Sequence, residues 1–399
     1  MNFLDGKFIT LGVTGSIASY KSIDLASKLT QLNCKVDVIM TESATRFLTP
    51  LTFNSITHRP VSIDLFESNS ELSMDHVVLA KRSEIIIVYP ATANIIAKIA
   101  HGFSDDLLTA TILATDVPII LAPAMDANMY ENPATQDNIT ILKNRGIKIV
   151  GPEMGRLASG LVGLGRVTDS EKILGNLNLI LGQKGDLNGK KIVVTAGGTK
   201  EEIDPIRYIS NRSSGKMGYA ISQAAINRGA EVTLISASNL LKDVIGAKTI
   251  HVSNANQMFE AVKKESKDSD VLIMAAAVSD WTPASYVNSK IKKTKKNTWQ
   301  IDLIKTSDIL KSIKNKELIK IGFSAETDDL IINATKKLKE KELDFIVAND
   351  VTKENSGFSS DNNKVFLIDQ NSPPEELPLM SKYEVGNAIL DRVKTGFHN

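Results

Sequence analysis

The stretches TAGGTKEEIDPIRYISNRSSGKMG (195–218) and GVTGSIAS (12–19) decide the fold of this chain. Each follows a short apolar run rich in Ile and Val, and each leads into a run with helical spacing of its apolar residues. A turn of small residues between a strand and a helix is typical of α/β domains with a parallel sheet. The sequence therefore predicts two such domains, and the chemistry of each turn indicates what it binds.

Alternating apolar and amphipathic runs fill the first half of the chain. Several short runs have the β-branched content of strands: 8–15, 35–41, 84–92, 117–125 and 147–152. The segments between them have helical spacing, and the last begins near a proline and ends at a glycine. We expect a doubly wound parallel sheet.

A second alternation follows a break in the pattern. The strand–helix pattern lapses around 170–190, where QKGDLNG (183–189) is typical of a linker. We therefore predict an α/β protein of two tandem Rossmann-like, doubly wound domains, at 1–186 and 187–399. The second half also holds a lysine-rich segment, 288–304, that we expect to form a hairpin.

The composition excludes several classes of function. The 399 residues include 47 Lys and Arg against 46 Asp and Glu, so no net charge favours a nucleic acid or an anionic membrane as partner. Cys34 is the only cysteine, which excludes an internal disulfide and a cysteine-based metal cluster. The N-terminus lacks a secretory pattern, and no apolar run reaches the ~18 residues that span a bilayer. We expect a cytoplasmic protein that acts on small molecules.

The turn at 12–19 has the chemistry of an anion site. Free N–H groups and the helix dipole favour a phosphate there, and small side chains let it approach. The spacing differs from the dinucleotide pattern GxGxxG, so NAD is not implied, and a tight turn without a ligand is the alternative. PATAN (90–94) and PAMDANMY (123–130) add polar groups at the ends of later strands, where open α/β sheets bind ligands.

These motifs, with others in the same order, resemble the flavin-dependent cysteine decarboxylases over nearly all of residues 5–180. The resemblance rests on GSIASYK, MDHVVLAKR, PATANIIAKIA, DDLLTA, PAMDANMYENPATQ and GRLASG. It implies a flavodoxin-like domain in which FMN accepts electrons from the cysteine-derived carbon before CO₂ departs. It implies His76 as the active-site base, whereas a lone histidine on a helix is more often structural. The implied FMN site comprises Gly15, Ser16, Ile17, Pro90, Ala91, Thr92, Ala93 and Asn94.

Two residues depart from the phosphopantothenoylcysteine branch of that family. Asp126 stands where asparagine is usual, and Ser159 stands where cysteine is frequent. The resemblance implies that the asparagine binds the substrate carboxylate and that the cysteine donates a proton late in the cycle. An ionised Asp126 would repel the carboxylate, and a serine hydroxyl is a much weaker acid than a thiol. We hypothesise that a protonated Asp126 both binds the carboxylate and donates the proton. The alternative is an impaired or regulatory flavin-binding half.

The second glycine turn also has the chemistry of a phosphate site. AGGT (196–199) ends a strand and RSSGKMG (212–218) begins a helix, so both can point N–H and hydroxyl donors at phosphate. The pattern is not a Walker A loop, because Lys216 is followed by Met217. A loop that covers a sheet edge is the alternative.

Charged residues farther along the chain add to this interpretation. Asp280 ends a strand and is suited to hold a cation or a ribose. KIKKTKK (290–296) has five lysines in seven positions and would neutralise a triphosphate, although such a run can also be a solvated hairpin. Lys337 and Lys341 lie one helical turn apart, a spacing that is also common on exposed helices.

With these residues the second half resembles the bacterial phosphopantothenate–cysteine ligases over residues 188–395. The resemblance rests on the 195–218 stretch, AAAVSDW, KIKK, GFSAET and VANDV. It implies activation of 4′-phosphopantothenate by CTP to an acyl-cytidylate, followed by attack of the cysteine amine, with Mg²⁺ held at Asp280. It implies catalytic roles for Lys290 and Asn211. The implied CTP site comprises Ala275, Ala276, Ala277, Asp280, Lys290, Asp308, Ile309, Phe323, Lys337 and Lys341.

The order of the two halves is similar to that of bifunctional proteins of coenzyme A biosynthesis, in which one half consumes what the other makes. The resemblance implies a homo-oligomer, with trimer-based decarboxylase halves and dimeric ligase halves. A tandem NAD(P)-dependent reductase is the competing interpretation, and the turn spacing argues against it.

Overall fold

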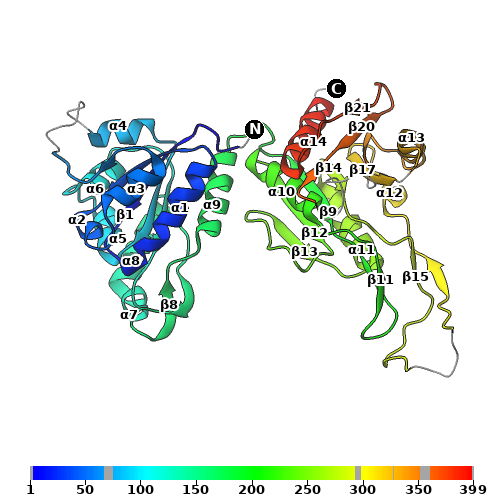
Figure 1. The fold of residues 1–399 in the computed structure, drawn as a ribbon, viewed down its shortest axis with the longest axis horizontal. Coiled ribbons are helices and arrows are strands. Elements are labelled where there is room, and N and C mark those ends of the chain that lie inside the picture. The colour runs from blue at the N-terminus through cyan, green and yellow to red at the C-terminus, as the bar shows by residue number, and fades with distance from the viewer. Residues whose placement is uncertain (1–2, 67–74, 293–297, 327, 351–359, 398–399) are drawn as a thin grey trace. The chain divides into compact units, whose positions relative to one another are not determined.

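The computed structural model describes residues 3–66, 75–292, 298–326, 328–350 and 360–397 (Figure 1). The chain divides between residues 181 and 182 into two compact units, each with its own sheet. Both units are α/β, which confirms the predicted fold class.

The sheet of the first unit is parallel, with strand order β3-β2-β1-β4-β5-β6. Its strands are β1 (Phe8–Val13), β2 (Lys35–Met40), β3 (Val61–Ser62), β4 (Ile85–Ala91), β5 (Ile119–Pro123) and β6 (Lys148–Ile149). Numbered along this unit, the order is 3-2-1-4-5-6, so the chain reverses direction across the sheet between β1 and β4. Ligands of such sheets bind at the carboxyl ends of the strands at that switch point.

Helices cover both faces of this sheet. They are α1 (Tyr20–Gln31), α2 (Glu42–Thr45), α3 (Pro50–Thr57), α4 (Asp75–Arg82), α5 (Ala93–His101), α6 (Leu107–Leu113), α7 (Ala127–Glu131), α8 (Pro133–Asn144) and α9 (Ser170–Gly182), with a 3₁₀ turn, η1 (Ile17–Ser19), before α1. Ile87 of β4 packs in one apolar cluster with α1 and α9, and its neighbour Val88 packs in another with α5 and α8. Strand β4 is buried along its whole length, as expected of a strand covered on both faces.

The structure corrects the predicted break at 170–190. Residues 170–182 form α9, whose Ile173 and Leu177 are fully buried in the core of the first unit. A hairpin of β7 (Glu153–Arg156) and β8 (Val162–Arg166), which the sequence did not indicate, precedes this helix. The polar stretch suited to a linker therefore begins only after α9.

The second unit has a sheet of eight strands, in the order β13-β12-β9-β14-β17-β18-β20-β21. The strands are β9 (Lys191–Ala196), β12 (Glu231–Ser236), β13 (Lys248–His251), β14 (Val271–Met274), β17 (Ile319–Glu326), β18 (Phe345–Asp350), β20 (Val365–Asp369) and β21 (Glu375–Glu376). The first six repeat the 3-2-1-4-5-6 order in parallel, and β20 and β21 extend the sheet antiparallel. The switch point lies between β9 and β14.

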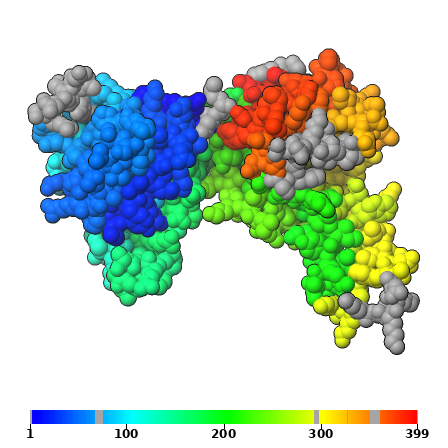
Figure 2. Space-filling view, viewed as in Figure 1, coloured from blue at the N-terminus to red at the C-terminus, as the bar shows by residue number. Residues whose placement is uncertain are grey.

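Helices and small ribbons complete this unit. The helices are α10 (Lys216–Asn227), α11 (Ala255–Glu265), α12 (Ile309–Ser312), α13 (Leu330–Glu340) and α14 (Lys382–Gly396), with a 3₁₀ turn, η2 (Ser266–Asp268). The ribbons pair β10 (Lys200–Glu202) with β11 (Tyr208–Ser210), β15 (Trp281–Pro283) with β16 (Leu303–Lys305), and β19 (Asn362–Asn363) with β22 (Met380–Ser381). The β10–β11 and β15–β16 ribbons project from the body of the second unit (Figures 1 and 2). Of the lysine-rich segment 288–304, which the sequence predicts to form a hairpin, the described residues contribute only to β16 of the β15–β16 ribbon; residues 293–297 fall outside the described part of the chain.

Candidate active sites

The switch point of the first sheet joins two of the predicted motifs through Thr14. The Thr14 hydroxyl donates a hydrogen bond to the Pro90 carbonyl at 2.8 Å and accepts one from the Thr92 N–H at 3.3 Å. Thr92 in turn caps α5, because its Oγ1 accepts from the Ile95 N–H. The glycine turn and the PATAN segment, which are far apart in sequence, therefore meet at one corner.

This corner fits the phosphate of a flavin. A methyl group on Gly15 would lie 2.4 Å from the Ser43 Cβ, so only glycine permits this close approach of the two turns. Ser16 caps the 3₁₀ turn by accepting from the Ala18 N–H at 3.2 Å. The Ser19 Oγ is buried without a hydrogen-bond partner in the described structure, and an unsatisfied donor at a helix start suits an anion. Ile17 remains 61 % exposed.

The structure brings Asp126 and Ser159 into contact, although they are 33 residues apart. The Ser159 hydroxyl donates to the Asp126 Oδ2 at 2.9 Å, and the Asp126 Oδ1 caps α7 by accepting from the Asn128 N–H at 3.1 Å. The Met125 N–H donates to the Gly165 carbonyl at 3.1 Å, which holds the turn after β5 against the hairpin that carries Ser159. The two departures from the family pattern therefore form one hydrogen-bonded pair.

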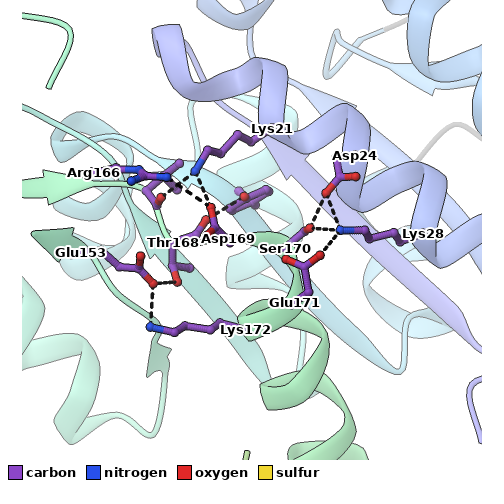
Figure 3. A network of polar contacts seen from close by, with 12 residues as sticks. Lys21, Asp24, Lys28, Glu153, Arg166, Thr168, Asp169, Ser170, Glu171 and Lys172 are labelled. Carbon is purple, nitrogen blue, oxygen red and sulfur yellow. Dashed lines mark hydrogen bonds and ion pairs between the residues drawn. The ribbon is translucent and has the colours of Figure 1, made fainter. Parts of the chain in front are cut away.

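Ionic contacts link the segment that follows this hairpin to helix α1 (Figure 3). Lys21 of α1 donates to the Val167 carbonyl at 3.2 Å and pairs with Asp169 at 2.8 Å. The buried Tyr89 hydroxyl donates to the Thr168 carbonyl at 2.8 Å. Lys28, farther along α1, contacts Glu171 at 2.5 Å. The segment that leaves β8 is thereby tied to both the helix and the sheet.

Two other groups of the first unit lie apart from these contacts. His76 is half-buried near the start of α4, and within the described residues no hydrogen bond joins it to Thr14, Thr92, Asp126 or Ser159. The thiol of Cys34 is buried in the core, and burial raises its pKa to about 12. Cys34 is therefore a packing residue and not a substitute proton donor.

At the switch point of the second sheet, the segments that follow β9 and β14 are joined mainly by backbone hydrogen bonds. The Ala277 N–H donates to the Gly197 carbonyl at 2.8 Å, and the Thr199 N–H donates to the Ala277 carbonyl at 3.2 Å. That carbonyl also accepts from the Asn211 side-chain amide at 3.1 Å. Gly197 has a φ of +86°, a conformation that favours glycine. The AGGT turn, Asn211 and the AAAVSDW segment are thus placed together.

A cavity of about 740 Å³ opens at this point. Every residue predicted for the ligase half except Lys290 lines it: Asn211, Ala275, Ala276, Ala277, Asp280, Asp308, Ile309, Phe323, Lys337 and Lys341. Lys341 pairs with Asp308 at 3.3 Å, and the Lys337 Nζ donates to the Phe323 carbonyl at 3.3 Å. The structure therefore gathers residues from five separate segments around one space.

The cavity wall is strongly cationic. Besides the predicted lysines, it is lined by Arg212, Lys216, Lys305 and Lys382, against the carboxylates of Asp280 and Asp308. This excess of positive charge suits a polyanion such as a triphosphate. Magnesium bound with a nucleotide commonly takes one or two protein carboxylates together with phosphate oxygens. Over the ranges that the structure describes, Asp280, unlike the ion-paired Asp308, forms no ion pair. In the described residues no group of three or more His, Cys, Asp or Glu side chains could hold a metal.

Sequence reasoning missed Lys382, which comes from the start of the last helix. The residue is 6 % exposed, and its Nζ donates to the Asn363 Oδ1 at 3.4 Å. Burial, and secondly the nearby Lys216, lower the pKa of Lys382. Lys216 itself pairs with Asp361 at 2.7 Å. No local motif surrounds Lys382, so only the three-dimensional fold reveals its place in the wall.

Lys290 is the predicted residue that the structure does not bring to the cavity. It is exposed, and the cavity wall, as far as the described residues define it, does not include it.

None of the helices in the described part of the chain is long and apolar enough to cross a membrane.

Two family models match this chain, one in each half. The family model named Flavoprotein matches residues 3–179, and the model of the DNA/pantothenate metabolism flavoprotein C-terminal domain matches residues 187–397. The coenzyme A biosynthesis bifunctional protein CoaBC of Vibrio vulnificus strain CMCP6 is 42 % identical over 399 residues, which cover 99 % of each chain. The chain belongs to the family of bifunctional proteins of coenzyme A biosynthesis.

A second relative and a solved structure are also similar to this chain. The CoaBC protein of Bacillus subtilis strain 168 is 43 % identical over 395 residues, covering 98 % of this chain and 97 % of the relative. A crystal structure of the C-terminal domain of a CoaBC protein is 40 % identical, covers 53 % of this chain and 97 % of its own, and has a TM-score of 0.46. As a member of this family the chain is an enzyme with decarboxylase and ligase activities, and its first half is a flavoprotein. The interpretation as a tandem NAD(P)-dependent reductase is not favoured.

Proposed function

We propose that the second half, residues 187–399, joins 4′-phosphopantothenate to cysteine with CTP, and that the first half, residues 1–186, decarboxylates the product with FMN. The observation that carries this proposal is the cationic cavity at the switch point of the second sheet, in a chain whose first sheet has a glycine turn suited to a phosphate at its own switch point. Two anion sites on two sheets suit two reactions that share an intermediate.

In the ligase reaction the cavity would hold the nucleotide and the carboxylate to be activated. An oxygen of that carboxylate attacks the α-phosphorus of CTP, and the bond to the β-phosphate breaks to release pyrophosphate. The cysteine amine then attacks the acyl carbon, and CMP leaves. Negative charge grows on phosphate oxygens in the first step, and positioned cations such as Lys337 and Lys341 stabilise it. Asp280 would hold Mg²⁺, whose charge assists in the same way.

Two side chains have more specific roles in this proposal. Asn211 lines the cavity and donates to the Ala277 carbonyl, and in this proposal its amide would contact the acyl-cytidylate. Lys290 would stabilise charge during activation, as the resemblance implies. Lys290 is exposed and does not line the cavity wall, so its side chain would have to reach the substrate from outside that wall.

In the decarboxylase half, the corner formed by Gly15, Ser16 and the PATAN segment would bind the FMN phosphate. FMN, when bound, supplies the two-electron chemistry of the reaction. His76 would accept the proton released from the substrate. The fit is supported by the buried Ser19 hydroxyl, which needs a partner, and by the absence of a side chain on Gly15.

Asp126 and Ser159 would act as one unit. The Ser159 hydroxyl donates to Asp126, so it orients a carboxyl group that would bind the substrate carboxylate in its protonated form and later return a proton to the product. In this arrangement serine need not be the acid that cysteine is, because it only orients one. The pair therefore offers a chemical replacement for the usual asparagine and cysteine.

The overall reaction is tested by the mass of the product. Purified protein is mixed with phosphopantothenate, cysteine, Mg²⁺ and either CTP or ATP. We expect 4′-phosphopantetheine with CTP, and a flavin absorbance that is retained on the protein. Accumulation of phosphopantothenoylcysteine would leave only the ligase assignment standing, and a lack of CTP-dependent pyrophosphate release would contradict that assignment as well.

The role of the Asp126–Ser159 pair is tested by exchanging it for the usual residues. We expect Asp126→Asn alone to reduce decarboxylation about 100-fold, which is within the usual range for the loss of an acid–base group. The double variant Asp126→Asn with Ser159→Cys should recover most of the activity, because it restores the common pair. If Asp126→Asn alone decarboxylates as fast as the wild type, the carboxyl group donates no proton.

The oligomeric state also belongs to this proposal. The ribbons of the ligase half expose large apolar side chains, among them Ile206, Tyr208, Trp281, Tyr286 and Ile304. A patch of this kind is typical of a protein contact surface. We propose that the ligase halves pair through these ribbons and that the decarboxylase halves assemble as trimers. Light scattering of the wild type and of an Ile206→Asp variant tests the pairing, which the variant should weaken.

A further inference from the structure

A buried carboxylate, Asp204, lies in the turn between β10 and β11. Its side chain has no exposed surface, and both oxygens accept hydrogen bonds. Oδ1 accepts from the N–H groups of Ile206 and Arg207, each at 2.9 Å. Oδ2 accepts from the Arg207 guanidinium, through Nε at 3.0 Å and Nη2 at 2.7 Å, and from the Ile291 N–H at 3.1 Å. A buried charge is stable only when its oxygens are satisfied in this way.

One of those donors belongs to the lysine-rich segment. Ile291 directly follows Lys290, and it is held from both sides, because its N–H donates to Asp204 and its carbonyl accepts from the Arg207 Nη2 at 2.7 Å. A third bond fixes the start of the segment, where the Val287 N–H donates to the Ile203 carbonyl at 3.1 Å. The backbone on either side of Lys290 is thus bonded to the 203–207 turn.

Arg207 adds a contact on the far side of the same hairpin. Its guanidinium carbon lies 4.8 Å from the centre of the Trp299 ring, a distance typical of stacking of an arginine on an aromatic face. Although burial alone raises the pKa of Asp204, the backbone N–H groups of Ile206 and Ile291 and the Arg207 side chain lower it to about 2. The carboxylate is therefore charged at any working pH, and the Asp204–Arg207 pair persists.

We propose that Asp204 is a positioning residue for Lys290. Together with Arg207 it fixes the position of the backbone that carries the Lys290 side chain. The proposal rests on the role proposed above for Lys290. A lysine side chain has a flexible four-carbon stem. Its ammonium group can therefore be held at a defined place in the substrate site only if the backbone that carries it is fixed. Misplacement of a catalytic group by about 1 Å can cost about 100-fold in rate. Both residues lie in the stretch EEIDPIRYIS (201–210), just before the glycine-bearing start of α10.

The first test compares Asp204→Asn with the wild type. The asparagine has the same shape, but it lacks the charge and one of the two acceptor oxygens. We expect CTP-dependent pyrophosphate release to fall at least tenfold, while the affinity for CTP in a binding titration changes less than twofold, because Asp204 is not part of the cavity wall. Asp186→Asn is the matched control, since it breaks another Asp–Arg pair of the same unit, with Arg228, and should leave the rate unchanged.

The second test is a double-mutant cycle with Lys290→Ala. If Asp204 acts through Lys290, Asp204→Asn lowers the rate no further once Lys290 is gone. A further tenfold loss in the double variant, or full activity of Asp204→Asn alone, overturns the inference. Full activity of Lys290→Ala would instead overturn the role proposed for Lys290. If Asp204→Asn does not fold, Arg207→Lys serves in the same cycle, because it keeps the charge and loses the fork that holds Ile291.

Discussion

The two halves of the chain place their sites at the same point of the same sheet order but form them from different groups. In the first half the hydroxyl of Thr14 bridges the two turns at the switch point. In the second half the backbone of Gly197 and Thr199 bonds directly to Ala277, and the β10–β11 ribbon is inserted between the glycine turn and its helix. The two units thus share a topology but differ in the groups that face the switch point, so we expect them to hold different kinds of ligand.

The difference matches the behaviour of the ligands proposed above. A cofactor that stays bound needs a fixed corner, and the Gly15 turn leaves no room for even a methyl group. A nucleotide that enters and leaves needs an open space with cations around it, which the cavity of about 740 Å³ supplies. The same strand order thus supports a tight glycine turn in one unit and an open cavity lined by cations in the other.

Loss of the proposed base should produce the largest effect and confine it to one half. We expect His76→Asn to reduce decarboxylation about 10³-fold, because no other group would accept the proton. Ligation and the flavin absorbance should remain, so phosphopantothenoylcysteine accumulates and is detected by mass. His58→Asn is the matched control, since His58 has a φ of +55° that asparagine tolerates, and it is exposed. Equal losses in both half-reactions would contradict the separation of the sites.

The converse variant, Lys290→Ala, should affect only the ligase half. We expect a loss of about 100-fold in CTP-dependent pyrophosphate release, comparable to the removal of one charge-stabilising donor. Decarboxylation of supplied phosphopantothenoylcysteine should be unchanged. Lys336→Ala is the control, because Lys336 is an exposed lysine of α13 that does not line the cavity. A similar loss in the control would mean that bulk charge, and not position, drives activation.

Gly15→Ala tests how tight the first corner is. The added methyl group would meet the Ser43 Cβ at 2.4 Å, so the two turns must separate. Overpacking of this kind costs about 1–3 kcal/mol, which corresponds to flavin binding weakened about 5- to 150-fold. Flavin retained after dialysis measures the effect, and ligation is unaffected. Ser43→Gly in the same chain removes the nearest atom and should recover part of the binding; no recovery would place the strain elsewhere.

The smallest effect concerns an ion pair of the second unit and its pH dependence. Hydrogen bonds from Arg228, together with Lys394, hold the pKa of Asp186 at about 2, despite partial burial. A lowered pKa contributes stability above the ordinary value near 4, and that contribution is lost as the pH falls towards 2. Because the group is partly exposed, we expect Asp186→Asn to cost only about 1 kcal/mol at pH 7. Denaturant unfolding should show the difference shrinking below pH 4; a constant difference would exclude the ion pair.

Much of the fold could be predicted from strands and turns, because buried parallel strands read as apolar runs bounded by small residues. The helix α9 could not, since Leu179, Ile180 and Leu181 form a continuous apolar run that hides the helical period. Strand β3 has two residues, too few to show any period, whereas β6 lies inside the predicted strand 147–152. A periodic pattern can be recognised only over several residues of mixed polarity. Strand β3 is too short for this, and the end of α9 is apolar throughout.

The candidate sites divide in a similar way. Residues within motifs, such as Asn211 and Ala277, were predicted and meet at the switch point. The contact of Asp126 with Ser159 supports the idea that the two departures belong together, although their roles stay proposals. Lys382 could not be predicted, because its position depends on α14 crossing back to the start of α10. The sequence around Lys382 contains no motif that would indicate its place in the cavity wall.

The outer strands of the two large sheets also affect how copies of this chain meet one another. Three of the four edges, β3, β6 and β21, are two residues long. The fourth, β13, carries an exposed lysine and an exposed histidine. Short or charged edges offer few free backbone groups for a foreign strand to pair with. The two large sheets therefore offer few edge groups through which one copy of the chain could pair with another.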